Sequence, residues 1–347
     1  MKIETYTDLS GFEALAGEWN DLLKRSAFDT LFLTWEWQRT WWEHLGEGDL
    51  FLIAIRDEQG RLTGIAPLYR TVSASGERKL NIVGCVDVSD YLDIIVAQGR
   101  EREVYSALLD YLDSNNEPSN AEIAGWDAAE LCNIPEVSPA HQALAEMAVE
   151  HGYEFRTIVE DVCPVIDLPA TWDEYLASLN KKQRHEIRRK MRRIEREADV
   201  NWYIVDQGRD LAEEIEAFIE LHQKSSADKG DFMDEHKKGF FRAVARVLQP
   251  LGWLQLAFIE VDGQKAAAML NFDYADTILV YNSGYDPRHR AHLSPGIVLL
   301  AYCIQHAIEL GRARFDFLRG DEPYKYRFGA KDTKVYRLII VREGDHR

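Results

Sequence analysis

Cysteine is scarce and scattered in this 347-residue chain. The four cysteines, Cys85, Cys132, Cys163 and Cys303, form no CxxC pair and no Cys/His spacing that suits a metal. The ten histidines show no ligand spacing with partners either. We therefore expect no metal cofactor, and we expect four reduced thiols in the core of a cytoplasmic protein.

Long apolar runs are also missing. No segment approaches the ~20 apolar residues of a membrane-spanning helix, and the N-terminus carries no charged-then-apolar signal. The formal net charge is −18, so the protein as a whole repels DNA and anionic membrane surfaces. The sequence thus predicts a cytoplasmic protein that has no membrane span and does not bind DNA.

The motifs of several large enzyme classes are absent. The sequence contains no G-x-S-x-G elbow, no HExxH, no Walker A loop and no EF-hand loop. These absences argue against the serine hydrolases, zinc proteases, P-loop NTPases and calcium-binding proteins that carry those motifs. Hydrophobic residues make up 46% of the chain, which is enough to fill ordinary cores.

What is present is a repeated pattern of strands. Residues 50–70 and 254–274 each read as a strand, an acidic-glycine turn and a second strand. Each is followed by more β structure, a helix and another strand, so the chain contains an imprecise internal repeat. We place the boundary between two α+β halves after residue 162, which gives domains 1–162 and 163–347.

The stretch from Ile278 to Lys325 carries the clearest site signal. A β-branched and aromatic run is followed by a basic loop and then by Ser294-Pro295-Gly296, which starts a helix. A helix N-terminus leaves N–H groups unpaired and attracts anions. An ordinary helix start with solvated arginines is an equally good interpretation. The anion interpretation predicts a phosphate or pyrophosphate site at Arg288, Arg290, Ser294 and Gly296.

A basic helix is predicted over residues 180–198, and residues 181–197 of it include nine basic and three acidic residues. Its apolar residues follow one stripe, so the charges face outward. Arg184 and Arg188 are four residues apart and suit an anionic substrate group. A solvated face and an RNA- or tRNA-binding face remain open as alternatives. Tyr285 and Asp286, at the end of the strand before the helix start, complete the candidate substrate-binding residues.

Four motifs resemble those of one family. They are Gly-Tyr-Asp-Pro (284–287), Leu-Ser-Pro-Gly (293–296), Phe-Asp-Phe-Leu-Arg-Gly (315–320) and Glu-Pro-Tyr-Lys (322–325). They are similar to the GNAT-type acetyltransferases of the CelD-like, cellulose-biosynthesis kind, which are related to the FemAB/FemX peptidyltransferases. The resemblance implies two tandem GNAT-like halves, each a mixed, mostly antiparallel sheet flanked by helices, with a degenerate first half.

The same resemblance implies an N-acyltransferase. The expected donor is acetyl-CoA or another acyl-CoA, and the expected acceptor is a small-molecule or saccharide amine, such as an amino sugar or a polysaccharide precursor. The candidate catalytic residues follow the second strand of the site. Asp316 or Glu322 would act as the base, Tyr324 as the acid that protonates the leaving thiolate, and Lys325 as the cation that stabilises the oxyanion. For Asp316, a structural carboxylate bonded to backbone N–H groups is equally open.

The loop departs from the usual GNAT pattern, Arg/Gln-x-x-Gly-x-Gly/Ala. Leu293 stands where the first glycine belongs, and Pro295 removes one N–H donor beside Gly296. Two alternatives therefore stand beside the acyl-CoA hypothesis. One is a Fem-like transferase that takes an aminoacyl group from tRNA. The other is a non-catalytic GNAT scaffold in polysaccharide synthesis.

Overall fold

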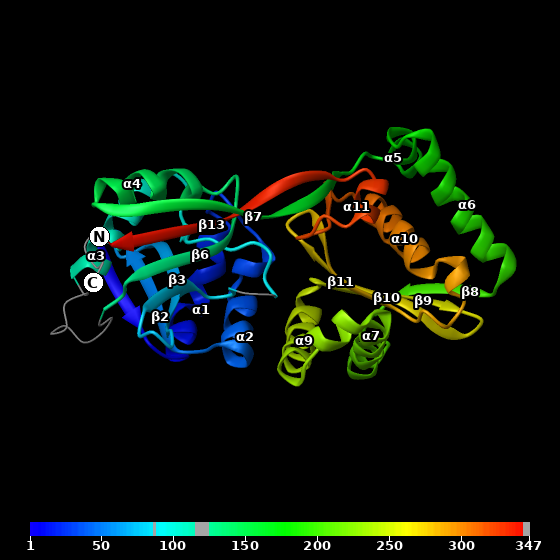
Figure 1. The fold of residues 1–347 in the computed structure, drawn as a ribbon, viewed down its shortest axis with the longest axis horizontal. Coiled ribbons are helices and arrows are strands. Elements are labelled where there is room, and N and C mark those ends of the chain that lie inside the picture. The colour runs from blue at the N-terminus through cyan, green and yellow to red at the C-terminus, as the bar shows by residue number, and fades with distance from the viewer. Residues whose placement is uncertain (86–87, 115–124, 343–347) are drawn as a thin grey trace. The chain divides into compact units, whose positions relative to one another are not determined.

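The chain divides into two compact units. The computed structural model describes residues 1–85, 88–114 and 125–342. Unit 1 comprises Met1–Asp161 and Thr333–Arg347, and unit 2 comprises Val162–Asp332 (Figure 1). The last strand of the chain, which we expected in the second half, thus belongs to unit 1.

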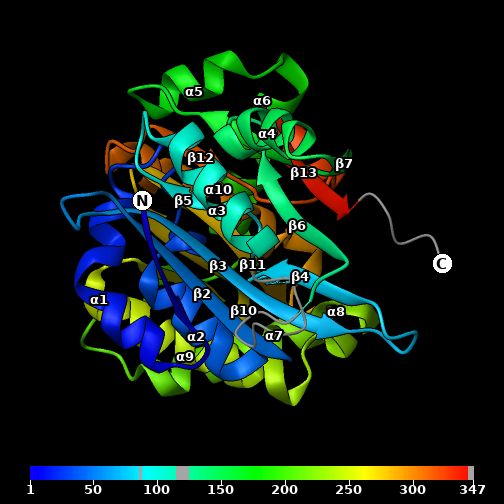
Figure 2. The same ribbon diagram turned by 90° about the vertical axis from the view of Figure 1, so that its left-hand side faces the viewer.

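Unit 1 is a mixed sheet with helices packed against it. The strand order is β1-β2-β3-β4-β6-β13-β7, with the short strand β5 paired to β3. The strands are β1 (Lys2–Tyr6), β2 (Asp49–Arg56), β3 (Leu62–Val72), β4 (Arg78–Ile82), β5 (Ile95–Val96), β6 (Ala128–Pro135), β7 (Tyr153–Asp167) and β13 (Lys331–Arg342). The helices are α1 (Ser10–Leu23), η1 (Leu31–Leu33), α2 (Trp35–Leu45), α3 (Glu101–Ser114), the π-helical η2 (Ala140–Leu144) and α4 (Ala145–Glu150), and Figure 2 shows them around the sheet.

Unit 2 has a sheet of the same kind. Its order is β7-β12-β11-β10-β9-β8, where β7 is the strand that begins in unit 1 and ends in unit 2. The other strands are β8 (Val200–Ile204), β9 (Leu254–Val261), β10 (Gln264–Tyr274), β11 (Thr277–Tyr285) and β12 (Arg314–Asp316). The helices are α5 (Trp172–Ser178), α6 (Lys181–Glu197), α7 (Leu211–Ser225), α8 (Ala227–Phe232), α9 (Glu235–Leu248), η3 (Gln249–Leu251), η4 (Ala291–Leu293), α10 (Pro295–Glu309) and α11 (Pro323–Arg327).

Helices cover both faces of the unit 2 sheet. α6 and α10 lie on one face, and α7 and α9 lie on the other (Figures 1 and 2). The sequence after Gly296 also has apolar residues at helical spacing, and these lie in the core of α10, where Leu300, Ala301, Ile304 and Ala307 are at most 2% exposed. Burying a leucine or isoleucine side chain contributes roughly 1.5–3 kcal/mol, so this stripe holds α10 against the sheet. The helix that follows the candidate anion loop is therefore fixed in place.

The two predicted hairpins are present, one in each unit. In unit 1 the Asp57 carboxylate accepts the backbone N–H groups of Gln59 and Arg61 at 3.0 and 2.9 Å, which closes the β2–β3 turn. In unit 2, Asp262 and Gly263 both have positive φ, as a tight turn between β9 and β10 requires. The predicted fold class, an α+β chain of two similar halves, is confirmed.

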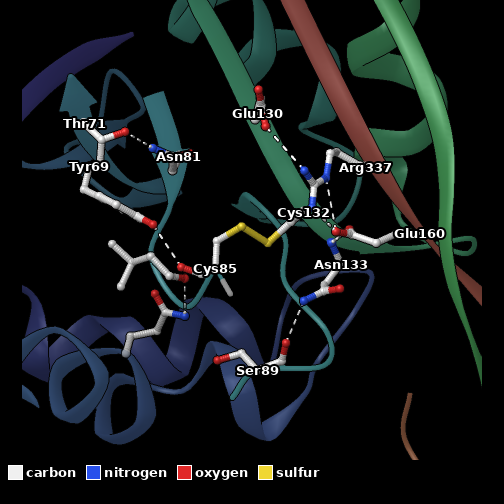
Figure 3. The surroundings of a disulfide bond; sticks show 12 residues. Tyr69, Thr71, Asn81, Cys85, Ser89, Glu130, Cys132, Asn133, Glu160 and Arg337 are labelled. Atoms are coloured by element: carbon white, nitrogen blue, oxygen red, sulfur yellow. Dashed lines mark hydrogen bonds and ion pairs between the residues drawn. A yellow bond between two sulfur atoms is a disulfide. The ribbon is translucent and has the colours of Figure 1, made fainter. Parts of the chain in front are cut away.

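The prediction of four reduced cysteines is wrong for two of them. Cys85 and Cys132 form a disulfide bond in unit 1, with their Cα atoms 6.0 Å apart (Figure 3). They meet because β4 and β6 pair in parallel just before them, and the sequence had not indicated a strand at Ala128–Pro135. Cys163 and Cys303 are buried thiols that take no part in a disulfide. We expected a cytoplasmic location partly because we expected four reduced cysteines. Disulfides are typical of proteins in oxidising compartments, so the cysteines do not support that expectation.

Other differences from the expected elements are small. The sequence also indicates strands at 153–159 and 165–168, and the structure joins these into one strand, β7. It further indicates a buried strand at 121–124, which lies outside the described residues. Among the helices that the structure describes, none is long and apolar enough to cross a membrane.

Candidate active site

The site is built around two parallel strands that separate. β11 and β12 pair only over three residues each, from Thr277↔Arg314 to Leu279↔Asp316. β12 then ends, and the chain turns away through Leu318, which has a φ of 56°. A bulge at the same place in the β10–β11 ladder shifts its register. Bulges often lie beside active sites because they re-aim the strand.

The N-terminus of α10 lies next to this opening in the chain path. Ser294 has left-handed backbone geometry, and its side chain does not cap the helix. Its hydroxyl instead bonds to the Lys190 ammonium of α6, with Nζ 2.8 Å from Oγ. The first turn of α10 contains no acidic residue. A cation beside the positive end of a helix is unfavourable unless an anion joins them, so this arrangement suits an anionic ligand.

A cavity of about 380 Å³ opens at this point. Its apolar wall includes Ile187, Ile297, Tyr324 and Phe328, and its polar wall comprises Lys182, Gln183, Glu186, Lys190 and Arg327. Three cations against one carboxylate leave the wall positively charged. The volume falls in the range of about 300–1,000 Å³ that is typical of small-molecule sites. The cavity therefore suits a ligand with an apolar part and an anionic group.

The predicted phosphate-binding residues have different partners in the structure. Ser294 contacts Lys190, and Gly296 lies in the first turn of α10. The Arg290 guanidinium is instead 2.5 Å from the Asp262 carboxylate, in the β9–β10 turn. The Arg288 side chain is exposed to solvent.

The predicted arginine pair lies on another side of α6. Arg184 donates to the carbonyls of Leu176 and Ala177, at the end of α5, and Arg188 is 3.5 Å from Asp173. Cavity-lining residues follow the spacing 182, 186 and 190, which is two residues out of phase with 184 and 188. Two residues correspond to about 200° around a helix. Arg188 faces an open groove of about 700 Å³, lined by His185, Arg188, Arg189, Arg192, Arg193, Arg196 and Glu197.

Lys325 is buried, and its ammonium group donates hydrogen bonds to the backbone of the loop after β12. Its side chain is 2% exposed, and Nζ lies 2.7 and 2.9 Å from the carbonyls of Arg319 and Gly320. The same ammonium is 2.9 Å from the Glu322 carboxylate. These acceptors use all three ammonium protons. The arrangement therefore leaves Lys325 no free N–H with which to bind an oxyanion.

Tyr324 lines the cavity. Its ring packs edge-on against Phe317, which directly follows β12. Burial, and then the nearby Glu322 carboxylate, raise the pKa of the Tyr324 phenol. The phenol is therefore protonated at neutral pH and is able to donate a proton or a hydrogen bond.

The remaining predicted residues have structural contacts. Asp316 is 7% exposed and accepts the backbone N–H of Leu318 at 2.7 Å, which is the structural arrangement left open for it above. The Asp286 pKa is lowered, first by the backbone N–H of Arg288. The Tyr285 side chain is exposed, and its backbone N–H donates to Ser225.

Sequence reasoning missed Lys182, Lys190 and Arg327. The first two lie on the predicted basic helix, and the i, i+4, i+8 spacing of 182, 186 and 190 was visible. Nothing in the sequence showed which flank of the helix would face α10. Within the described residues, no group of three or more His, Cys, Asp or Glu side chains is placed to hold a metal ion.

Residues 181–326 match the family described as the acetyltransferase (GNAT) domain. This match lies within unit 2. No curated protein sequence matches the chain. The whole chain is similar in fold to FemX, with 13% identity, 97% of each chain covered and a TM-score of 0.65. It is also similar to L-PGS from Bacillus licheniformis, with 14% identity, 97% of this chain and 92% of that chain covered, and a TM-score of 0.56.

A tandem GNAT protein from the clavulanic acid biosynthesis pathway is a further match. Its identity is 13%, with 99% of this chain and 100% of that chain covered, at a TM-score of 0.50. At these identities the likeness concerns the fold. The chain therefore has the fold of two GNAT-like halves in tandem, and the residues that match the family model lie in the second half.

Proposed function

We propose that the protein is a GNAT-type N-acyltransferase that moves an acyl group from acyl-CoA, most simply acetyl-CoA, to an amine. The observation that carries this proposal is the Lys190–Ser294 contact at the uncapped start of α10, beside a positively charged cavity. The CoA phosphates would interact with Lys190, Ser294 and the free N–H of Gly296. Arg288, exposed on the preceding loop, would add charge at the mouth.

The acyl arm would follow β11 towards the point where β12 leaves it. β12 pairs with β11 only as far as Leu279, and Tyr324, which follows β12 in the chain, lines the cavity. Attack of a neutral amine on the thioester carbonyl forms the C–N bond and an oxyanion. Collapse of that species breaks the C–S bond, and the protonated Tyr324 phenol would give its proton to the leaving thiolate.

Glu322 is the better of the two predicted bases. The Asp316 carboxylate is buried and bonded to a backbone N–H, whereas Glu322 lies in an exposed loop. The acceptor would be a small amine, and the family resemblance favours an amino sugar or a precursor of a cell-envelope polysaccharide. Because Arg184 and Arg188 lie outside the cavity, they would contact only a large acceptor.

A second candidate is Fem-like transfer of an aminoacyl group from tRNA. The observation that favours it is the groove on α6, whose wall holds five arginines and one glutamate. Its charge suits a nucleic-acid backbone. A non-catalytic scaffold is the third candidate, and it would retain the fold without donor binding.

Calorimetric titration with acetyl-CoA tests the first candidate. Desulfo-CoA and adenosine diphosphate are the ligand controls. Lys190→Met should weaken acetyl-CoA binding by about tenfold, or about 1.4 kcal/mol. Lys181→Met is the matched control, because Lys181 is an exposed residue of the same helix that does not line the cavity.

If no CoA species binds, the acyl-CoA proposal fails. Binding of charged tRNA that weakens in Arg192→Met would then support the second candidate. If neither acyl-CoA nor charged tRNA binds to the folded protein, the result supports the third candidate, a non-catalytic scaffold.

A further inference from the structure

The outer edge of β11, on the side that β12 leaves, is not bare. Residues two apart in a strand point their backbone groups to the same edge. Ser283 and Tyr285 form such a pair. The carbonyl of Ser283 accepts a hydrogen bond from the Lys229 ammonium at 2.6 Å, and the N–H of Tyr285 donates to Ser225 Oγ at 2.8 Å. Side chains from α7 and α8 thus occupy the edge along which the proposed acyl arm would lie.

The approach of α7 to this edge is close. A Cβ placed on Gly284 would lie 2.3 Å from the backbone nitrogen of His222, so only glycine fits there. His222 also bonds to Asn282 of β11, with Nε2 3.0 Å from Oδ1. These contacts fix the end of α7, and therefore the start of α8 that carries Lys229.

Lys229 differs from the other lysines near the site. Its amine is largely withdrawn from water, and burial is the main cause that lowers its pKa, while the Glu322 carboxylate acts in the opposite direction. Lys224, the last residue but one of α7, is exposed and 2.6 Å from Glu220, which raises its pKa. Lys190 is hydrogen-bonded to Ser294, and Lys325 has no free proton.

A neutral Lys229 would keep its hydrogen bond to Ser283 and still have a lone pair. One N–H donates to the carbonyl, so the lone pair is directed away from the strand. Ser283 lies four residues beyond Leu279, the last residue of β11 that pairs with β12. The Lys229 amine therefore lies on the edge of β11 beyond the point where β12 leaves it, along which the proposed acyl arm would run.

We propose that Lys229 is a self-acylation site, whose amine takes the acyl group from a bound acyl-CoA when no other amine is present. The inference rests on the proposed function, because acyl-CoA is the co-reactant. The neutral Nζ attacks the thioester carbonyl and forms the C–N bond. The C–S bond breaks, the thiolate leaves, and the proton lost from the nitrogen neutralises it. The products are N-acyl-Lys229 and free CoA.

The test uses the wild-type protein, so it does not depend on a variant that folds poorly. The protein is incubated with acetyl-CoA at pH 8, and acetylation of each lysine is followed by peptide mass spectrometry. Lys229 should be acetylated at least about tenfold faster than Lys224, and excess desulfo-CoA should abolish that difference. Lys229→Arg should lose the fast acetylation while it retains acetyl-CoA binding, whereas Lys224→Arg should change neither.

Calorimetry on the same samples separates the two proposals. Acetyl-CoA binding with equal acetylation of Lys229 and Lys224 would overturn the self-acylation site and leave the proposed function intact. Absence of acetyl-CoA binding, with no preferential acetylation, would overturn both. Fast acetylation of Lys229 that desulfo-CoA does not suppress would also count against the proposal, because it would show reaction from solution.

Discussion

The two halves of the chain share a topology but differ at the point where their two parallel strands stop pairing. In unit 1, β4 and β6 pair in parallel over three residues each, up to Asn81↔Glu130, and the Cys85–Cys132 disulfide joins them just beyond. In unit 2, β11 and β12 pair in parallel over the same length, up to Leu279↔Asp316. Ser283 and Leu318 are the residues of unit 2 that correspond to Cys85 and Cys132, because they lie equally far beyond the last pair. A disulfide therefore joins the two strands of unit 1 at a position where no disulfide joins the two strands of unit 2.

The helix starts differ in the same sense. α3 of unit 1 has Glu101 and Glu103 in its first turn, and the Glu101 carboxylate accepts the N–H of Gly99 at 2.9 Å. Its N-terminus is thus neutralised by its own carboxylates. α10 of unit 2 has no acidic residue there and has Lys190 beside it. The comparison indicates that a tandem fold keeps two copies of a framework, but only unit 2 has a helix start suited to an anionic donor.

The largest expected effect concerns Lys325 in unit 2. Lys325→Met should destabilise unit 2 by about 3–5 kcal/mol, because it leaves the buried carbonyls of Arg319 and Gly320 without their charged partner. Urea denaturation, with hydrogen exchange to localise the change, measures this. Lys331→Met, at an exposed position, is the control. Unchanged stability with lost activity would instead support the predicted catalytic role of Lys325.

Removing the disulfide of unit 1 should lower the free energy of unfolding slightly less than Lys325→Met does. Cys85→Ser removes a cross-link over 47 residues of sequence, for which we expect a loss of about 3–4 kcal/mol. Hydrogen exchange should increase around β4 and β6, while acetyl-CoA binding remains at the wild-type level. Reduction of the wild-type protein with dithiothreitol should reproduce the effect. A loss of donor binding would show that the two halves are not independent in this respect.

A third test concerns a buried carboxyl of unit 1. Burial raises the pKa of Asp93 to about 7, although Ser138 donates a hydrogen bond to it. A raised carboxyl pKa favours the folded state below the unfolded value of 3.8, and that contribution is lost as pH rises through 7. Asp93→Asn should therefore be more stable than the wild type at pH 8, by on the order of 2–3 kcal/mol, but not at pH 5. Thermal unfolding at the two pH values measures this, and equal shifts at both would contradict the titration of Asp93.

The smallest effect would make the start of α10 resemble that of α3. Ile297→Glu places a carboxylate in the first turn of α10, as Glu103 does in α3. Acetyl-CoA binding should weaken by about tenfold, or ~1.4 kcal/mol, through repulsion of the donor phosphates. Ile297→Gln is the uncharged control of similar size. If Glu and Gln weaken binding equally, the loss is one of apolar contact and the electrostatic comparison between the helices does not hold.

Local patterns in the sequence were enough to predict the framework. The hairpins, the α10 helix and the apolar stripe of α6 follow from turn residues and periodicity, which depend on near neighbours. The side of α6 that faces the cavity was not predictable, because it depends on where α10 and α11 pack. The disulfide was missed for a similar reason, since it depends on the pairing of β4 with β6. Lys325 was found by its motif, but its contacts depend on how residues 318–320 fold back.

Unit 1 is formed by two segments that are separated in the chain by unit 2, and this affects how it folds during synthesis. Its sheet includes β13, which lies between β6 and β7 and follows all of unit 2 in the chain. A ribosome delivers β13 only after nearly all of residues 162–332 have been translated, so in a nascent unit 1 the position between β6 and β7 is vacant while unit 2 is already able to fold. During that interval β6 and β7 both present unpaired edges, which are the parts of a nascent chain most exposed to wrong strand pairing.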